Sequence, residues 1–413
     1  MADIHLGGWR EDTLREIGIK TFEKAIDISI QEKVDFIIVS GDFFDSSNPT
    51  IDVMVKAAKK LYELKLNDIP VYVIEGSHDF SPTGRTILKV FQEAGLLKRV
   101  TSGEEIDGRL ILKGIVDEKT KIKIFGISGT RRSLEKADYS RLDRDEIENQ
   151  EGNKIFLFHS AIEELKSGNL YQIESIPISL LPKGFLYYAG GHIHEKGEYE
   201  LGEYKNVVFP GALFPNNLDE LLNFKGGGFY LVEYHNEIIN KKYTPIIIAP
   251  VILLDVHLDG IHPINIEEKV RDVSDKNNLK DGIVILKFKG KIEGKLSDIN
   301  FKKINSYLEN KGALLIKRDT RDIKTNEFRE IKNSSFTKEK LEEDVIVRHK
   351  DQIKIKECQT ETVSFVKAFM TILSKEKKEG EKKDDYNKVV LNESIVYLSK
   401  NNLLEELDET NST

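Results

Sequence analysis

Histidines and aspartates gather in five short motifs in the first half of the chain. The motifs are Asp3-Ile4-His5, Gly41-Asp42-Phe43-Phe44-Asp45, Gly76-Ser77-His78-Asp79, His159 and Gly191-His192-Ile193-His194. Imidazole and carboxylate groups are the nitrogen and oxygen ligands that hold divalent transition metals. Because the motifs follow apolar runs that predict strands, the ligands should gather at one edge of a sheet. The pattern indicates a two-metal hydrolytic site.

Hydrolysis of a phosphate ester at such a site needs two cations about 3.5–4 Å apart, which neutralise the phosphate and activate a water molecule. We expect Asp42 to touch both ions, with terminal ligands from Asp3, His5, His159, His192 and His194. His78 follows a tight turn and is our candidate general acid, with Asp79 orienting it. Asp45 would hydrogen-bond a ligand imidazole. Each motif alone has an ordinary structural reading, such as a turn aspartate, but their recurrence at successive strand ends favours the metal site.

The apolar spacing predicts an alternation of helices and strands around these motifs. We expect helices over residues 13–31, 51–66 and 86–97, and strands over residues 36–39, 71–74, 123–127, 154–158 and 186–189. Two further strands, near residues 206–211 and 227–232, would complete the first domain.

The length of 413 residues favours two or three domains. We expect a first domain over residues 1–245, a small α/β domain over 246–320, a linker over 321–354 and a helical segment over 355–413. The last segment carries two amphipathic helices, near 361–374 and 386–399, on a charged tether. Such helices either dock on a partner or pack as a hairpin on their own protein, and docking is the reading we favour.

Composition places few limits on function. The net charge of −8 argues weakly against a nucleic-acid coat protein, but not against an enzyme that binds phosphates through local basic groups. Arg85, Arg131 and Arg132 are candidates for such DNA contacts. A single cysteine, Cys358, excludes an intramolecular disulfide, and no apolar run approaches the roughly 20 residues that span a bilayer. We expect a cytoplasmic protein without a membrane partner.

The motifs resemble those of the calcineurin-like metallophosphoesterases. Within that superfamily they are similar to the DNA double-strand-break repair nucleases of the Mre–Rad (meiotic-recombination-eleven and SbcD-like) family, archaeal type. The similarity rests on Asp3-Ile4-His5-Leu6-Gly7, Ser40-Gly41-Asp42-Phe43-Phe44-Asp45, Tyr188-Ala189-Gly190-Gly191-His192-Ile193-His194 and Phe209-Pro210-Gly211. It covers roughly residues 1–245, and the order of an accessory domain and a terminal helical pair is also similar.

The resemblance implies an α/β fold: a two-sheet metallophosphoesterase sandwich flanked by helices, a small α/β capping domain and a C-terminal helical pair. It implies two Mn²⁺ per subunit and His78 as the catalytic acid. One ion would be held by Asp3, His5, Asp42 and His194, and the other by Asp42, Ser77, His159 and His192.

The resemblance also implies partners. These are DNA ends, a second copy of the chain bound through the helices at 51–66 and 86–97, and a coiled-coil SMC-like zinc-hook ATPase bound through residues 360–400 or so. Such a protein would be nucleoid-associated, in a prokaryotic or archaeal cytoplasm.

Two departures from the family pattern have consequences. Ser77 stands where the family usually has asparagine, and a hydroxyl is a shorter and weaker ligand than an amide carbonyl. Only Met1 and Ala2 precede the first motif, which normally ends a strand, so we expect a truncated N-terminus or else a poorly held Asp3.

Three functions remain open on the sequence alone. The first is a manganese-dependent DNA nuclease with 3′→5′ exonuclease and single-strand endonuclease activity, which processes break ends together with the ATPase. The second is a phosphodiesterase acting on a small nucleotide, for which the long C-terminal extension has no use. The third is a catalytically weakened scaffold that binds DNA ends, suggested by Ser77 and the short N-terminus.

Overall fold

The computed structural model describes residues 1–101, 103–129, 135–166, 173–235, 238–325, 346–347, 362–375 and 383–400. Chain contacts divide it into two units, Met1–Phe328 and Arg329–Thr413. Two of the predicted DNA contacts, Arg131 and Arg132, lie outside the described residues. Over the described part of the chain, no helix is both long and apolar enough to cross a membrane.

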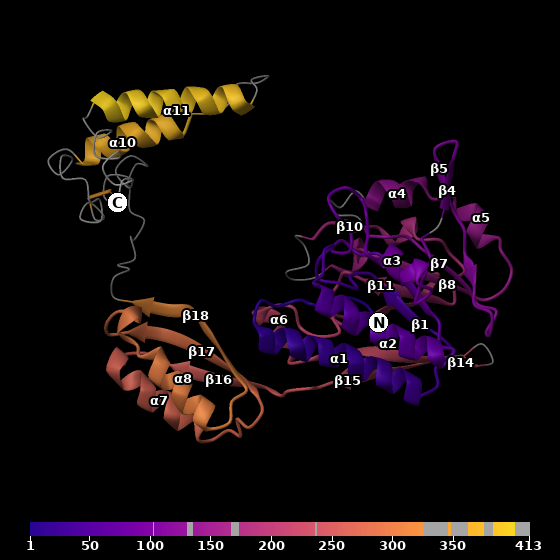
Figure 1. The fold of residues 1–413 in the computed structure, drawn as a ribbon, viewed down its shortest axis with the longest axis horizontal. Helices are drawn as coiled ribbons and strands as arrows, with labels where there is room; N and C mark the ends of the chain where they lie inside the picture. Colours follow the sequence, from indigo (N-terminus) through magenta and orange to yellow (C-terminus); the bar gives the residue numbers. More distant parts are fainter. Residues whose placement is uncertain are drawn as a thin grey trace. The chain divides into compact units, whose positions relative to one another are not determined.

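A parallel three-stranded sheet carries the second and third motifs. It consists of β1 (Ile37–Ser40), β2 (Val71–Ile74) and β3 (Lys98–Arg99). Helices α1 (Asp12–Gln31) and α2 (Ile51–Leu66) lie side by side (Figure 1) and begin and end within one residue of the predicted bounds. Their apolar stripes pack with the outer face of this sheet, in a core that includes Phe22, Ile26, Val39, Leu61 and Val73.

A six-stranded sheet carries the two later motifs. Its strand order is β12 (Gly197–Leu201), β13 (Tyr204–Phe209), β11 (Tyr187–Gly191), β8 (Lys154–His159), β7 (Lys123–Gly126) and β6 (Ile115–Val116). Tyr72 and Ile74 of β2 pack with Ile124, Leu157 and Val208 of this sheet, which makes the predicted two-sheet sandwich. The opposite face is covered by a second core that includes side chains of α4 (Glu135–Arg141) and α5 (Arg144–Glu148).

Several elements of the first domain differ from the prediction or are absent from it. Helix α3 covers only Leu88–Glu93 rather than 86–97, because Thr86 pairs with Phe80 in a β-bridge and Gly95 takes a positive φ of 66°. The hairpin of β4 (Gly103–Ile106) and β5 (Arg109–Leu112) was not predicted, although its Asp107-Gly108 turn has the two positive φ angles typical of tight hairpins. Shorter elements are β9 (Ala161–Ile162), β10 (Ser175–Ile176) and α6 (Leu218–Phe224).

The first six residues run beside the end of β1. The Ser40 amide donates to the Met1 carbonyl and the Asp3 amide to the Gly41 carbonyl, while the Leu213 amide donates to the Asp3 carbonyl. The side chain of Asp3 is buried and accepts the His192 amide. The prediction that a start at this point would leave Asp3 poorly held is therefore wrong.

The Met1 amine is enclosed. It donates to the Ile38 carbonyl, and burial lowers its pKa to about 5. Met1 lines a cavity of about 540 Å³, together with residues that include Ile38, Ser40, Phe229 and Tyr230. The prediction of a truncated N-terminus stays a prediction.

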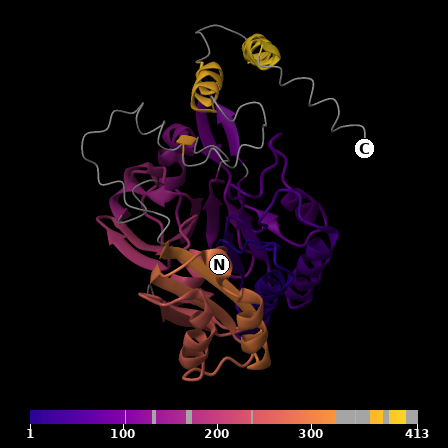
Figure 2. The ribbon, with the colours of Figure 1, turned by 90° about the vertical axis from the view of Figure 1, so that its left-hand side faces the viewer.

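The chain then passes through a hairpin, β14 (Gly227–His235) and β15 (Ile238–Ile246), into the accessory subdomain, which we define as residues 251–325. This subdomain is a parallel sheet of β16 (Val251–His257), β17 (Ile283–Ile292) and β18 (Leu315–Thr325), with α7 (Ile266–Ser274) and α8 (Phe301–Asn310) on one face (Figure 2). The linker predicted from residue 321 begins too early, because β18 pairs with β17 as far as Thr325.

In the second unit, α10 (Thr362–Leu373) and α11 (Lys383–Lys400) pack against each other. The ring of Tyr397 stacks on Phe365 and Phe369, at centroid distances of 5.5 and 6.3 Å. The second helix was predicted to be amphipathic, yet its apolar side chains Val389 and Ile395 are exposed.

Candidate metal centre

The motifs of both sheets meet at one place. Among the described residues, three groups of side chains offer ligand atoms within 4.8 Å of one another: Asp3, His5 and His194; His5, Asp42 and His78; Asp3, Asp42 and His159. The groups overlap in Asp3, His5 and Asp42, so they form one continuous cluster. Its members come from the N-terminal segment, the ends of β1 and β2, the end of β8 and the loop after β11.

Unusual backbone geometry turns several ligands inward. Asp3, His5, Asp42 and His192 have positive φ angles of 48°, 45°, 48° and 79°. Residues other than glycine adopt this left-handed region at a cost, and such residues cluster at functional sites. Glycines provide the close approaches: a Cβ on Gly41 would lie 2.2 Å from His159 Nδ1, and one on Gly76 would lie 2.2 Å from Asp42 Oδ1.

Asp42 lies at the centre of the cluster. Its Oδ2 is 3.3 Å from His159 Nε2 and 3.7 Å from His5 Nε2, and its Oδ1 accepts the His78 amide at 2.8 Å. Burial raises the pKa of this carboxyl, but the neighbouring imidazoles, His159 foremost, hold it below its ordinary value. The group is therefore a carboxylate with imidazoles on two sides, as a bridging ligand needs to be.

The contacts of His159 suit a metal ligand. Its Nδ1–H donates to the Ser40 carbonyl at 2.8 Å, so the other nitrogen, Nε2, is the one turned to Asp42. Among the residues that the structure describes, that buried Nε2 has no hydrogen-bond partner. Since buried polar atoms are nearly always paired, a cation between Nε2 and the Asp42 carboxylate would satisfy this atom. The donor set of imidazoles and carboxylates fits a divalent metal.

Two predicted ligands lie at the margin. His192 belongs to none of the three groups; its ring centroid is 5.3 Å from that of His159, and its amide donates to Asp3. Burial and then the charge on His159 lower the pKa of His192 to about 4, which keeps the imidazole neutral and able to bind a metal. Ser77 lies half-buried in the turn between Gly76 and His78.

The structure gives Asp79 a different role from the one predicted. Its buried carboxylate accepts the amides of Phe43, Phe44 and Gly76, and so joins the two loops that carry Asp42 and His78. Burial, and then the charge of Asp42, raise its pKa to about 7. The exposed His78 ring donates instead from Nδ1 to the Asp45 carbonyl, at 2.7 Å. Asp79 positions the loops rather than the His78 ring.

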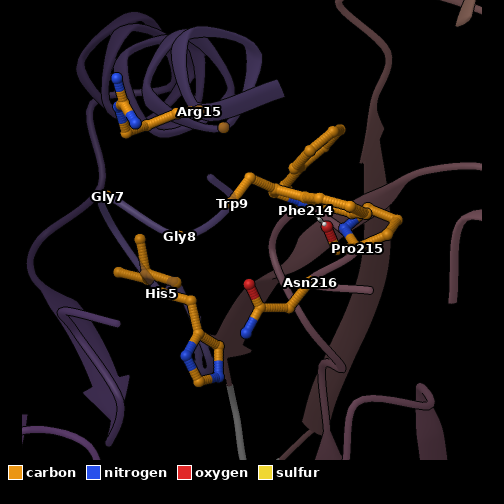
Figure 3. A pocket seen from close by; sticks show the side chains of 10 residues that line it. His5, Gly7, Gly8, Trp9, Arg15, Phe214, Pro215 and Asn216 are labelled. Atoms are coloured by element: carbon orange, nitrogen blue, oxygen red, sulfur yellow. Dashed lines mark hydrogen bonds between the residues drawn. The ribbon is translucent and has the colours of Figure 1, made fainter. Parts of the chain in front are cut away.

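Asp45 lies beside a ligand imidazole, with its Oδ1 3.3 Å from His5 Nδ1. The same oxygen accepts the side-chain amide of Asn216 at 3.1 Å. Figure 3 shows the side chain of Asn216 extending toward that of His5. Trp9 lies nearby, and its indole donates to the Pro215 carbonyl. Sequence reasoning missed Asn216 and also Glu220, which accepts a hydrogen bond from His194 Nδ1 at 2.9 Å. Both lie outside the histidine motifs, and only their closeness in space reveals them.

Comparison of the sequence with known proteins identifies the family of the chain. A model described as "Calcineurin-like phosphoesterase" matches residues 1–196. The "DNA double-strand break repair protein Mre11" of Methanococcus maripaludis is 30% identical over 59% of this chain and 68% of its own. The protein of the same name from Archaeoglobus fulgidus is 25% identical over 70% of this chain and 67% of its own length. The one from Sulfurisphaera tokodaii is 28% identical over 70% of this chain and 73% of its own length.

The chain belongs to the Mre11 family. It is a metal-dependent phosphoesterase, and the residues matched by the calcineurin-like model include every member of the cluster around Asp42. A solved calcineurin-like phosphoesterase, YfkN from Bacillus subtilis, is 13% identical, with a TM-score of 0.37 over 67% of this chain and 95% of the other.

For this Mre11 family member we predict that metal binding releases protons. Burial is the largest single influence and lowers the pKa of His159, but the interactions with Asp42, Asp3 and the Ser40 carbonyl together outweigh it and raise the pKa to about 10. The metal-free protein therefore carries a proton there at pH 8. A cation must displace that proton. We expect release of at least about one proton per protein at pH 8, and an apparent affinity that rises up to about tenfold per pH unit below pH 10.

Calorimetric Mn²⁺ titration in buffers of different ionisation enthalpy measures this release. Working at pH 8 leaves Asp79 mostly ionised, since its pKa is about 7, and so removes its contribution. A heat of binding that is the same in every buffer would contradict the prediction.

Proposed function

We propose that this protein is a manganese-dependent DNA nuclease that trims double-strand-break ends, with 3′→5′ exonuclease and single-strand endonuclease activity. The main support is the overlap of the three ligand groups at Asp3, His5 and Asp42, with the exposed His78 beside them. A site of this kind suits a phosphodiester that arrives from solvent. Further support comes from relatives whose names assign them to repair of DNA double-strand breaks.

Two Mn²⁺ per subunit would be held by the ligands named above, with Asp42 shared between them. Bound there, the ions would supply charge neutralisation of the phosphate and activation of a water molecule. The chain would supply a proton for the leaving oxygen from His78. Its ring donates Nδ1–H to the Asp45 carbonyl, which leaves Nε2 as the nitrogen that can face the substrate. Nε2 carries a proton only when the ring is an imidazolium, so His78 acts as an acid in its charged form.

A buried network fixes the loop that carries His78. The carboxylate of Glu75 accepts hydrogen bonds from Arg99, from Thr101 Oγ1 at 3.1 Å and from Ser128 Oγ at 2.7 Å.

Arg85 is exposed in the loop that follows Asp79, and it remains our candidate for a phosphate contact.

A substrate comparison tests the proposal. The purified protein is incubated with Mn²⁺ and, in separate reactions, a labelled DNA hairpin and a cyclic dinucleotide. We expect cleavage of the DNA and little turnover of the dinucleotide. Cleavage of the dinucleotide alone would replace the nuclease by a small-nucleotide phosphodiesterase, and DNA that is bound but stays intact would indicate a scaffold.

We further infer a homodimer that uses α2. This helix is apolar on two sides: Ala57, Leu61 and Leu64 face the core, while a second row faces solvent. The exposed row consists of Ile51, Val55, Tyr62 and Leu66, and Val90 of α3 is also exposed. At 100° per residue, the four α2 residues fall in one narrow stripe. Exposed apolar rows of this kind mark interaction surfaces.

A charge on this stripe should separate the subunits. We expect Tyr62→Glu to raise the dissociation constant of the dimer at least about tenfold, because an interface would have to bury an unpaired carboxylate. Sedimentation equilibrium measures the constant. Ile264→Glu is the matched control, since Ile264 is exposed in the accessory subdomain. An equal effect of both variants, or none for Tyr62→Glu, would refute this interface.

We also infer that the α10–α11 pair docks on a coiled-coil ATPase of the SMC type. After the aromatic stack with Tyr397 is formed, apolar side chains remain exposed on both helices: Met370, Leu373, Val389, Leu391, Ile395 and Val396. A helix that is apolar on more than one side is stable only when something covers it. The family resemblance suggests this ATPase as the cover.

Removing residues 355–413 should abolish co-purification of the ATPase while leaving Mn²⁺-dependent cleavage of DNA intact. Leu391→Glu should weaken the association at least about tenfold, because it places a charge in the apolar contact. Asn392→Glu is the control at the neighbouring exposed position. Undiminished co-purification of the truncated protein would refute the docking.

A further inference from the structure

A short segment after β13 contacts two predicted metal ligands, His194 directly and His5 through Asp45, on the side of each ring that faces away from the cluster. It comprises residues 215–220, from Pro215 into the first turn of α6. Glu220 Oε1 accepts from His194 Nδ1 at 2.9 Å, and Glu220 Oε2 accepts from the Asn216 amide at 2.7 Å. The Asn217 side chain caps α6 by accepting the Glu220 amide at 2.9 Å, and it donates in turn to Glu220 Oε1. Glu220 is therefore fixed at both its backbone and its carboxylate.

The same segment reaches the second imidazole through Asp45. Asn216 Nδ2 donates to Asp45 Oδ1, which lies 3.3 Å from His5 Nδ1. The Nε2 atoms of His5 and His194 lie 3.1 Å apart, within the group that they share with Asp3. In both rings, Nδ1 faces a carboxylate that belongs to residues 215–220 or is hydrogen-bonded to them: Glu220 for His194 and Asp45 for His5. In both rings, Nε2 faces the other imidazole within the cluster.

The opposite side of α6 is attached to the accessory subdomain. Leu221 is fully buried in a cluster with Ile283 and Ile285 of β17, and Leu14 and Ile17 of α1 join the same cluster. Next to Glu220, the carboxylate of Asp219 accepts both terminal nitrogens of Arg321 on β18, at 3.1 and 2.5 Å. Arg321 is itself held by Asp319 of the same strand.

A carboxylate behind a ligand histidine affects metal binding. When Nδ1–H is donated to a carboxylate, the ring takes the tautomer that presents a lone pair at Nε2, and the ring becomes more basic. The orientation is also fixed, so less freedom is lost when the cation binds. A shift of α6 would alter the hydrogen bond to His194, because Glu220 lies on that helix.

We propose that Glu220 is the positioning residue for His194, and that α6 links the accessory subdomain to the affinity of the ion bound by Asp3, His5 and His194. The proposal rests on the metal centre of the proposed function. A contact made far from the ligands, between Asp219 and Arg321, therefore influences metal occupancy. Any partner that moves the accessory subdomain would change the affinity of this one ion.

Two measurements on the full chain test the proposal. In the metal-free protein, ¹⁵N NMR of histidine reports the tautomer of His194 at a pH where the ring is neutral. In Mn²⁺ titrations followed by electron paramagnetic resonance, the affinity of each ion is obtained separately. The first readout needs no metal, so it separates failure of this proposal from failure of the proposed function.

We expect Glu220→Ala to weaken one Mn²⁺ step by about 10–100-fold, the usual effect of losing a partner of a ligand histidine, and to mix the tautomers of His194. Glu220→Gln, whose carbonyl still accepts from Nδ1, should keep the tautomer and lose less affinity. Asp219→Ala should weaken the same step about two- to fivefold, in line with the strength of an exposed ion pair. The matched control is Glu200→Ala, at an exposed position of β12.

An unchanged tautomer and unchanged affinities in Glu220→Ala would overturn the positioning role. Should Glu220→Ala fail to fold, the isosteric Glu220→Gln decides, since it should still lower the affinity of one step only. A loss spread equally over both ions, or no loss in Asp219→Ala, would overturn the link through α6.

Discussion

Asp42→Asn should abolish metal-dependent catalysis. We expect each Mn²⁺ to bind more than about 100-fold more weakly. Losing a hydrogen-bond partner of a ligand histidine already costs about 10–100-fold, and Asp42 is the ligand that we propose both ions share. The variant keeps the shape of the side chain, and its Oδ1 still accepts the His78 amide. What it loses is the negative charge beside His159 and His5, at 3.3 and 3.7 Å.

The same substitution should lower the pKa of His159. Burial alone lowers that pKa, and the charge of Asp42 is the main influence that raises it to about 10. Without that charge, the buried ring of the metal-free protein should be neutral at pH 8, and ¹⁵N NMR detects the change. Metal titration and the DNA hairpin assay measure the loss of binding and of cleavage. Asp52→Asn, at an exposed position of α2, is the matched control. Tight binding of two Mn²⁺ by Asp42→Asn would show that Asp42 is not the bridge.

His78→Ala should separate catalysis from metal binding. We expect the rate of DNA cleavage to fall by about 10²–10⁴-fold, the usual contribution of a general acid, while Mn²⁺ affinity changes less than about threefold. The reason is geometric: the His78 ring is exposed and bound to the Asp45 carbonyl, and Asp42 is held by the His78 backbone amide, which alanine retains.

A substrate with a better leaving group provides the control. If His78 protonates the leaving oxygen, a nitrophenyl phosphodiester needs no such proton, and the variant should cleave it at close to the rate of the unaltered protein. His235→Ala, at an exposed position of β14, should change neither rate. An equal loss on both substrates would make His78 a metal ligand or a structural residue, and a loss of Mn²⁺ affinity would decide for the ligand.

The main chain pattern of the first domain could be predicted closely from the sequence. The bounds of α2 and β2 are those predicted, because continuous apolar runs and helical stripes are local signals that tertiary contacts here do not override. The prediction was less good for α3, where a β-bridge at Thr86 competes with the helix, and for the β4–β5 hairpin, whose strands have only four residues each and little apolar alternation.

Among the residues of the cluster, too, some could be predicted from the sequence and others could not. Asp3, His5, Asp42, His159 and His194 could be named from the sequence, because metal ligands are restricted to a few residue types that recur at strand ends. The role of Asp79 could not be predicted, because a carboxylate that follows a histidine in the sequence need not contact its ring. The Asp79 carboxylate accepts hydrogen bonds from three backbone amides instead.

The sequence by itself determined which atoms can bind a cation and roughly which strands carry them. Only the tertiary structure decided which nitrogen of each imidazole faces the cluster, and it did so through distant groups: the Ser40 carbonyl behind His159, and Glu220 behind His194. Ligand chemistry belongs to a residue type, whereas the orientation of a ring depends on hydrogen bonds to groups that are neighbours only after the two sheets and α6 have come together.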